Sequence, residues 1–288
     1  MTGFDYDTAF SRNIGWLTPA EQATLRDKKI AIAGLGGAGG VHLLTLARLG
    51  IGRFHIADLD RFDWVNFNRQ AGASASSVGE LKSQVMARLA RDINPELDIT
   101  VFDEGVQAHN IDAFLDGVDL YVDGLDYFVF PARRLVYDAC RARGIPITFA
   151  VPLGMGAAVL NFLPDGPAFD DYFQLSAHPE HEWPVRFLVG LAPALLHRGY
   201  LVYPEIVDFA AQRVPSTGIA CQMCAGMAGT EALKILLGRG VVRGVPHSLQ
   251  FDAYTGRLKH VVRRGGNRHP LNRLAIAYVN RRLARARR

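Results

Sequence analysis

The sequence predicts an α/β protein with a Rossmann-like, doubly wound sheet that is mainly parallel and is extended by antiparallel strands in the C-terminal half. Three observations lead to this prediction. A strand, a glycine-rich turn, a helix and a second strand follow one another between residues 29 and 60; strand–helix alternation continues to about residue 152; and two later strand-like segments flank a turn at 254–256. Strands that alternate with helices form parallel sheets, whereas strands joined by a short turn pair antiparallel.

The first strand–turn–helix–strand unit is the most informative stretch of the chain. Residues 30–33 are an apolar run of strand length, residues 41–49 show helical spacing, and residues 53–58 form a second strand that ends in an acid. In such units the glycines let backbone N–H groups approach phosphates at a helix N-terminus, and the acid accepts hydrogen bonds from ribose. The pattern alone fits a dinucleotide as well as a mononucleotide. The candidate binding residues are Gly34, Gly36, Gly37, Gly39 and Asp58.

The later elements follow from the same periodicities. We expect helices at about 79–93, 131–143, 186–197 and 222–237, and strands at 99–102, 118–122, 146–151, 157–162, 247–250 and 257–261. Residues 164–185 are expected to form a long polar and aromatic connection. Ligands of doubly wound sheets bind beyond the carboxyl ends of the strands. The acids expected at this edge are Asp58, Asp60, Asp123 and Asp126, although Asp123 could equally cap the following turn.

The chain divides into four expected segments within a single domain. They are an N-terminal arm and helix (1–28), a nucleotide-binding half (29–152), a substrate-binding or crossover half (153–265) and a basic C-terminal helix (266–288). The net charge of +4 is concentrated at that end, since residues 263–288 contain nine arginines and no acid. A solvated basic helix explains this bias without further function, and contact with RNA or with an acidic protein is the functional alternative.

The composition indicates a globular protein of a reducing compartment. Hydrophobic residues make up 49% of the chain and charged residues 21%. The first ten residues show no basic region followed by an apolar run, and the most apolar later stretch, 187–196, is too short to cross a bilayer. Three cysteines in 288 residues favour a reducing environment. We therefore expect a cytoplasmic protein with no membrane partner.

Several motifs in register make the sequence similar to one enzyme family. They are GLGGAG at 34–39, DLD at 58–60, NFNRQ at 66–70, GELK at 79–82 and DGLD at 123–126. With these motifs, and with AGMAGTEALK at 225–234, the chain resembles the ubiquitin-activating E1-like enzymes, the ThiF/MoeB/HesA adenylyltransferases. The resemblance covers about residues 12–151 and 215–240. The asparagine, arginine, lysine and aspartate in register are far more specific than the glycines.

The resemblance implies a reaction and the residues that perform it. Family members condense a carboxylate with ATP to give an acyl-adenylate and pyrophosphate. Arg69 and Lys82 match the positions that contact the phosphates, and Asp126 matches the acid that holds Mg²⁺. Preorganised cations would stabilise the charge that develops on the phosphates, and Mg²⁺ would neutralise the leaving group. The candidate catalytic residues are therefore Arg12, Arg69, Lys82 and Asp126.

Other positions of the resemblance concern nucleotide binding and assembly. Asp58 matches the ribose-binding acid, and Asn66 matches an asparagine of the nucleotide site. Asp60 and Gln70 are further nucleotide-binding candidates from the same motifs, although Asp60 could instead only position its loop. Arg12 matches an arginine that reaches across a homodimer into the ATP site of the partner. The resemblance therefore implies a homodimer.

The sequence departs from the family pattern at its cysteines. Many members bind structural zinc through two Cys-x-x-Cys pairs, but here only Cys221 and Cys224 form such a pair. His178 and His181 could complete a mixed site, yet we expect free cysteines and no zinc. No cysteine lies between Cys140 and Cys221, where members that form acyl or persulfide intermediates carry one. We hypothesise that the reaction stops at the acyl-adenylate, which another nucleophile captures.

The predicted function is that of an ATP- and Mg²⁺-dependent adenylyltransferase acting on a carboxylate, at the C-terminus of a ubiquitin-like protein or a peptide. Val65, Phe67 and Tyr127 stand where the family commonly has serine, leucine and asparagine, so the groove need not suit a standard ubiquitin-like tail. Three alternatives remain: an NAD- or FAD-dependent oxidoreductase, a relative that activates a carboxylate on a modified tRNA base, and a non-catalytic scaffold. The two cations and the metal-binding acid favour a triphosphate over NAD or FAD.

Overall fold

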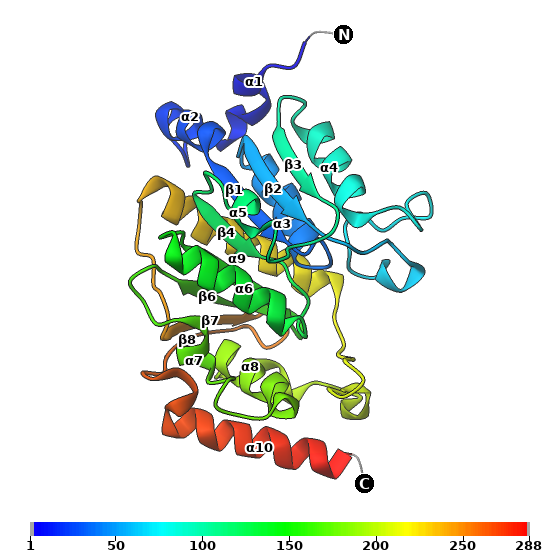
Figure 1. Ribbon diagram of the computed structural model, residues 1–288, viewed down its shortest axis with the longest axis vertical. Coiled ribbons are helices and arrows are strands. Elements are labelled where there is room, and N and C mark those ends of the chain that lie inside the picture. The colour runs from blue at the N-terminus through cyan, green and yellow to red at the C-terminus, as the bar shows by residue number, and fades with distance from the viewer. Residues whose placement is uncertain (1–2, 287–288) are drawn as a thin grey trace.

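The computed structural model describes residues 3–286 and builds them around an eight-stranded sheet with the order β3-β2-β1-β4-β5-β6-β7-β8. Strands β1 to β5 pair in parallel, and β6, β7 and β8 continue the sheet in antiparallel pairs. The predicted fold class is thus confirmed, including the antiparallel C-terminal extension (Figure 1). Arg287 and Arg288 of the predicted basic tail lie outside the described residues.

The elements have the following bounds. The strands are β1 (Lys29–Ala33), β2 (Arg53–Ala57), β3 (Asp98–Phe102), β4 (Leu120–Asp123), β5 (Ile147–Leu153), β6 (Gly156–Phe162), β7 (His247–Asp252) and β8 (Arg257–Val262). The α-helices are α1 (Tyr6–Phe10), α2 (Pro19–Asp27), α3 (Gly39–Arg48), α4 (Lys82–Ile93), α5 (Ile111–Phe114), α6 (Phe130–Ala142), α7 (Phe169–Phe173), α8 (Trp183–Leu191), α9 (Gly218–Leu237) and α10 (Pro270–Ala286). Short 3₁₀ turns include η1 (Ser11–Asn13) and η2 (Trp64–Asn66). No described helix combines the length and hydrophobicity that crossing a bilayer requires.

Helices cover both faces of the sheet, and each face has its own apolar core (Figure 1). Helices α2, α3, α4 and α9 pack against Ile30, Ile32 and their neighbours. Helices α5 to α8 pack on the opposite face, against Ala31 and Tyr121. The alternation within β1 follows from strand geometry, because successive side chains of a strand point to opposite faces.

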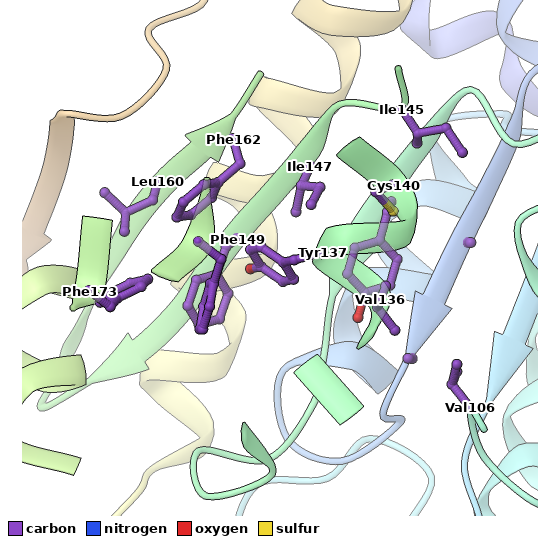
Figure 2. Packing of buried hydrophobic residues seen from close by; sticks show 14 of the residues in the cluster. Val106, Val136, Tyr137, Cys140, Ile145, Ile147, Phe149, Leu160, Phe162 and Phe173 are labelled. Atoms are coloured by element: carbon purple, nitrogen blue, oxygen red, sulfur yellow. The ribbon is translucent and has the colours of Figure 1, made fainter. Parts of the chain in front are cut away.

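Helix α6 shows how closely the second core is packed. Its residues Val136, Tyr137 and Cys140 lie beside Ile147 and Phe149 of β5 (Figure 2). The Cys140 thiol is completely buried in this core, and burial raises its pKa to about 12. The thiol therefore stays protonated and acts as a packing group.

The sheet order places the carboxyl ends of β1 and β4 side by side, with chain connections leaving in opposite directions. From β1 the chain proceeds through α3 to β2 on one side, whereas β4 continues through α6 to β5 on the other. Such a switch point opens a crevice at the carboxyl edge of a doubly wound sheet. The glycine turn after β1 and the turn after β4 both meet there.

Two expectations between residues 164 and 197 were wrong. The helix predicted at 186–197 is α8, which begins earlier and ends at Leu191. Ala192 leaves the helical region because Pro193 follows it, and proline disfavours α conformation in the preceding residue. The predicted connection at 164–185 contains the short helix α7. The polar composition of the connection gave no helix prediction, yet α7 buries Phe169, Tyr172 and Phe173.

Candidate functional site

A large cleft of about 1960 Å³ opens at the carboxyl edge of the sheet. One end, here called the nucleotide end, is lined by the glycine turn after β1 and by the loops after β2 and β4. The other end, here called the far end, is lined by residues of the segment 195–207 and by Tyr278 and Arg282 of α10, whereas Ser216 lies beside Asn68 of the nucleotide end. Most sequence-predicted candidates line the nucleotide end: Gly34, Gly36, Gly37, Asp58, Asp60, Asn66, Arg69, Gln70, Lys82, Asp123 and Asp126.

At Gly34 and Gly39 the glycine turn passes too close to neighbouring backbone for a larger residue. Gly34 has a φ of +82°, and a Cβ added there would lie 2.3 Å from the carbonyl oxygen of Gly124. A Cβ added to Gly39 would lie 1.7 Å from the carbonyl oxygen of Gly34. Glycine at these positions lets β1, α3 and the end of β4 converge. The turn therefore presents bare backbone at the start of α3, which is how phosphate groups are bound in such folds.

Asp58 ties the glycine turn to the loop after β2. Its Oδ2 accepts a hydrogen bond from the Leu35 N–H at 2.6 Å, and its Oδ1 accepts one from the Asp60 N–H at 2.8 Å. Burial raises the pKa of the Asp58 carboxyl, and these two hydrogen bonds oppose that shift. A carboxylate offers about four lone-pair sites, so this arrangement leaves capacity to accept hydrogen bonds from ribose hydroxyls.

Lys82 is the first residue of α4 and is held by the same loop. Its Nζ lies 3.0 Å from Oδ2 of Asp60, and its backbone N–H donates to the Asp60 carbonyl oxygen at 2.9 Å. The lysine side chain is 8% exposed, whereas that of Asp60 is 60% exposed. The solvent-exposed Asp60 thus holds the buried Lys82 ammonium at the wall of the cleft.

The NFNRQ motif supplies three further side chains. Oδ1 of Asn66 accepts from the Asp63 N–H at 3.1 Å and so closes the η2 turn. Nη1 of Arg69 donates to the Val65 carbonyl oxygen at 3.1 Å. Gln70 is buried, and its Oε1 has no partner among the described residues. A buried amide oxygen without a partner is costly, so the site fits a ligand that brings a hydrogen-bond donor.

The two acids of the DGLD motif have different environments. Asp123 is completely buried at the end of β4 and forms an ion pair with Arg133 of α6, with 2.8 Å between Oδ2 and Nε. Asp126 is exposed on the following turn, where its Oδ1 accepts from the Phe128 N–H at 3.1 Å. Both acids line the cleft, but the Asp123 carboxylate is engaged by Arg133, whereas Asp126 is the exposed acid of this motif.

Sequence reasoning missed Arg133. Its Nη2 donates to the carbonyl oxygens of Leu125 and Asp126, at 2.7 and 3.0 Å. One signal was present, because Arg133 stands at helical spacing from Val136 and Tyr137 and so belongs to the buried face of the helix. A charged residue on such a face needs a buried partner, which here is the acid at the end of β4.

Arg12 does not reach the cleft of its own chain. It is exposed in η1, in an arm that packs against the loop between α3 and β2. The Tyr6 hydroxyl donates to the Gly50 carbonyl oxygen there, and Nδ2 of Asn13 donates to the Leu49 carbonyl oxygen. That loop precedes β2 and so lies at the amino edge of the sheet, opposite the cleft. The role predicted for Arg12 therefore requires a second copy of the chain.

Among the described residues no three His, Cys, Asp or Glu side chains lie together in a way that could hold a metal ion. Mg²⁺, however, is commonly bound by one or two carboxylates together with phosphate oxygens and water. Asp126 at the cleft matches that donor set. The residues present therefore fit a Mg²⁺ ion that arrives with a nucleotide, with Asp126 as its protein ligand.

The sequence matches the model of the ThiF family over residues 10–272. It is 27% identical over 222 residues to the SAMP-activating enzyme E1 of Haloferax volcanii, which covers 77% of this chain and 72% of that protein. It is also 35% identical over 113 residues to the tRNA threonylcarbamoyladenosine dehydratase of Haemophilus influenzae. That match covers 39% of this chain and 43% of the dehydratase, so the chain spans less than half the length of that relative.

The fold is likewise shared with solved structures. The structure of E. coli MccB with ATP superposes with a TM-score of 0.65 and 17% sequence identity, covering 91% of this chain and 71% of that one. At this level of identity the likeness establishes the common fold. The family match extends from the N-terminal arm to the start of α10.

Proposed function

Since the chain belongs to the ThiF family, we propose that it uses ATP and Mg²⁺ to adenylate a carboxylate, with release of pyrophosphate. One observation carries this proposal: Asp58, Arg69, Lys82 and Asp126, from four separate motifs, line the same end of one cleft beside the glycine turn. Two cations and two acids with distinct environments suit a triphosphate better than NAD or FAD. The structure of MccB with ATP adds that a protein of this fold binds this nucleotide.

In the proposed reaction a carboxylate oxygen of the substrate forms a bond to the α-phosphorus, and the oxygen that bridges the α- and β-phosphorus atoms leaves with pyrophosphate. Arg69 and Lys82 bind the phosphates and stabilise the charge that grows on the leaving group. Asp58 orients the ribose, and the glycine turn receives phosphate oxygens at the start of α3. Asp126 would hold Mg²⁺, which when bound neutralises phosphate charge and orients the leaving group.

We propose that the carboxylate belongs to the C-terminus of a ubiquitin-like protein or a peptide. Exposed apolar side chains, Leu201, Val202 and Tyr203 among them, line the far end of the cleft and suit an extended polypeptide. The name of the SAMP-activating relative points to a protein substrate of this kind. The second candidate is a carboxylate on a modified tRNA base, favoured by the dehydratase relative and by Arg282 of the basic helix α10 at the same end.

We also propose a homodimer in which Arg12 of one copy completes the nucleotide end of the other. The arm exposes Trp16 next to Arg12, and the loop beside the nucleotide end exposes Trp64, Val65 and Phe67. Grouped exposed apolar side chains of this kind mark protein–protein interfaces. The proposal accounts for the distance between Arg12 and the cleft of its own chain.

Calorimetric binding of ATP with Mg²⁺, compared with NAD⁺, tests the reaction class. We expect ATP binding that depends on Mg²⁺, and loss of that dependence in Asp126→Asn. Asp112→Asn, an exposed acid of α5 paired with Arg143, is the matched control. Binding of NAD⁺ alone would make the protein an oxidoreductase, and binding of neither would indicate a scaffold. Pyrophosphate exchange with peptides bearing free C-termini, or with bulk tRNA, then separates the two substrate candidates.

A further inference from the structure

We infer that Arg133 is a positioning residue that clamps the turn carrying Asp126 and so fixes where this acid meets Mg²⁺ and ATP. The inference rests on the proposed function for the role of Asp126. It rests on the structure for the clamp itself, because every contact of the clamp lies within one chain and involves no ligand.

The clamp consists of the Arg133 guanidinium, the Asp123 carboxylate and the backbone groups of Leu125 and Asp126 to which they are hydrogen-bonded. Nε of Arg133 donates to Oδ2 of Asp123 at 2.8 Å, and Nη2 donates to the carbonyl oxygens of Leu125 and Asp126 at 2.7 and 3.0 Å. Oδ1 of Asp123 accepts from the Leu125 N–H at 2.9 Å. The side chains of Arg133 and Asp123 thus hold the backbone of Leu125 and Asp126, the two adjacent residues at the centre of the turn. The planar fork of an arginine can reach these acceptors together, whereas the single ammonium of a lysine cannot.

The guanidinium is itself held in place from several sides. Both side chains of the ion pair are completely buried. The Arg133 Cζ lies 5.3 Å from the ring centre of Phe149 and 4.9 Å from that of Phe187. The Tyr137 hydroxyl donates to Oδ2 of Asp123 at 2.9 Å, and Figure 2 shows Tyr137 beside Phe149 and Phe162 of the aromatic core. The clamp therefore transmits the rigidity of the core to an exposed turn.

A contribution to folding stability does not by itself explain why Arg133 and Asp123 form a buried ion pair. Replacing a buried ion pair with apolar side chains of similar volume is often neutral or stabilising, because both charges must lose their water. Nη1 of Arg133 also has no partner among the described residues, so the burial is incompletely compensated. The two bonds to carbonyl oxygens are what the arginine adds beyond the ion pair. Their acceptors, Leu125 and Asp126, belong to the turn at the cleft.

The test compares Arg133→Lys and Arg133→Met with Arg134→Met. Arg134 is the next residue of α6, and it pairs at the surface with Asp170. The control therefore removes an arginine and an ion pair without touching the turn. The first readout is hydrogen exchange of the amides of residues 124–129 in the protein without nucleotide. The second is the gain in ATP affinity that Mg²⁺ produces, measured by calorimetry.

We expect faster exchange in this turn for Arg133→Lys and unchanged exchange for the control. We also expect the Mg²⁺-dependent gain in ATP affinity to fall by about 10- to 100-fold, the usual effect of removing a group that orients a metal ligand. Unchanged exchange in a folded Arg133→Lys protein would overturn the clamp. Faster exchange with an unchanged Mg²⁺ gain would overturn its coupling to Asp126. Arg133→Met removes both the charge and all the hydrogen bonds of the guanidinium. It is used for the same two measurements if its melting curve shows a folded protein.

The outcome is distinguishable from failure of the proposed function. If Asp126→Asn leaves Mg²⁺-dependent ATP binding intact, the role proposed for Asp126 fails, and the inferred coupling fails with it, whatever the Arg133 variants do. If Asp126→Asn removes the gain and Arg133→Lys does not, the inference about Arg133 fails while the proposed function stands.

Discussion

The Nζ atom of Lys82 lies 3.0 Å from Oδ2 of Asp60, although the lysine is almost fully buried and the aspartate is largely exposed. The pair thus places a cation inside the wall of the cleft and its counter-charge at the surface. An incoming phosphate can take over from Asp60 without leaving the ammonium unpaired. We propose that this arrangement keeps the Lys82 side chain oriented before ATP binds.

Lys82→Met should therefore lower pyrophosphate exchange by about 100-fold or more, the usual effect of removing one group that stabilises a developing charge. Lys28→Met is a matched control, because Nζ of Lys28 also pairs with an aspartate, Asp119, at 2.9 Å. Lys28 immediately precedes β1 and so lies at the edge of the sheet opposite the cleft. Equal activity losses in both variants, or a collapsed melting curve only in Lys82→Met, would indicate a structural role.

Arg12→Ala should be inactive alone and should regain activity when mixed with Lys82→Met. The reason is that each mixed dimer would contain one cleft with both an intact Lys82 and an intact Arg12 from the other copy. Pyrophosphate exchange of the mixture, after subunit exchange, measures this. Mixing Arg12→Ala with wild type gives the reference for exchange efficiency. Absence of any recovery, with mixed dimers present, would contradict donation between copies.

Gly39→Ala should destabilise the protein by about 3 kcal/mol, since the new methyl would lie 1.7 Å from the Gly34 carbonyl oxygen and the backbone must shift. Gly226→Ala in α9 is the control, because no atom lies within 4 Å of a Cβ added there. That change should be neutral or stabilise the protein by about 0.5–1 kcal/mol through helix propensity. Urea unfolding measures both, and equal effects would show that the glycine turn tolerates side chains.

The sequence predicted the fold class from local patterns, and it predicted the candidate residues of the nucleotide end partly from strand ends and partly from the resemblance to the ThiF/MoeB/HesA adenylyltransferases. A period of two or of 3.6 marks the strands and helices, and strand ends locate the acids at one edge. The partners of those acids were not predictable in the same way. The sequence assigned Mg²⁺ to Asp126 and left Asp123 as a possible turn cap, but the ion pair of Asp123 with Arg133 depends on a tertiary contact that no local pattern encodes.

The far end of the cleft was less predictable for a related reason. Segment 195–217 contains two short 3₁₀ helices, at 196–199 and 204–206, and an isolated bridge between Asp208 and Arg213, and its path depends on contacts with distant parts of the chain. One example is Tyr200, whose hydroxyl accepts from the Met155 N–H and donates to Asp252. Periodicity carries no information on such contacts, so the sequence did not predict which residues line the far end.

The cysteines should form no covalent intermediate during the reaction. Burial raises the pKa of the Cys221 thiol, and it raises that of Cys224 still further above its usual range. A thiol attacks an adenylate as its thiolate, so we expect neither residue to act as the nucleophile. Intact mass spectrometry after incubation with ATP and substrate should show unmodified protein. An acyl or persulfide adduct on either residue would overturn the hypothesis that the enzyme stops at the acyl-adenylate.

Folding stability should decline as the pH falls from about 6.5 toward 4 because of His42. This residue is completely buried, and burial lowers its pKa to about 4. In the unfolded chain the imidazole has its ordinary pKa, so the unfolded state binds more protons throughout that window. The difference amounts to about 3 kcal/mol of unfolding free energy at pH 7, lost progressively on acidification.

His42→Gln should flatten this dependence, because the variant has no imidazole to protonate on unfolding. Urea unfolding of the two proteins at about pH 7 and pH 5 measures the slope. His109→Gln is the control, since His109 is exposed and pairs only with Glu104 at the surface. If the slope of His42→Gln matches that of wild type, His42 is protonated as readily in the folded protein as in the unfolded chain. The buried contact of its Nε2 with the Cys224 thiol, at 3.7 Å, would then have to admit water or rearrange.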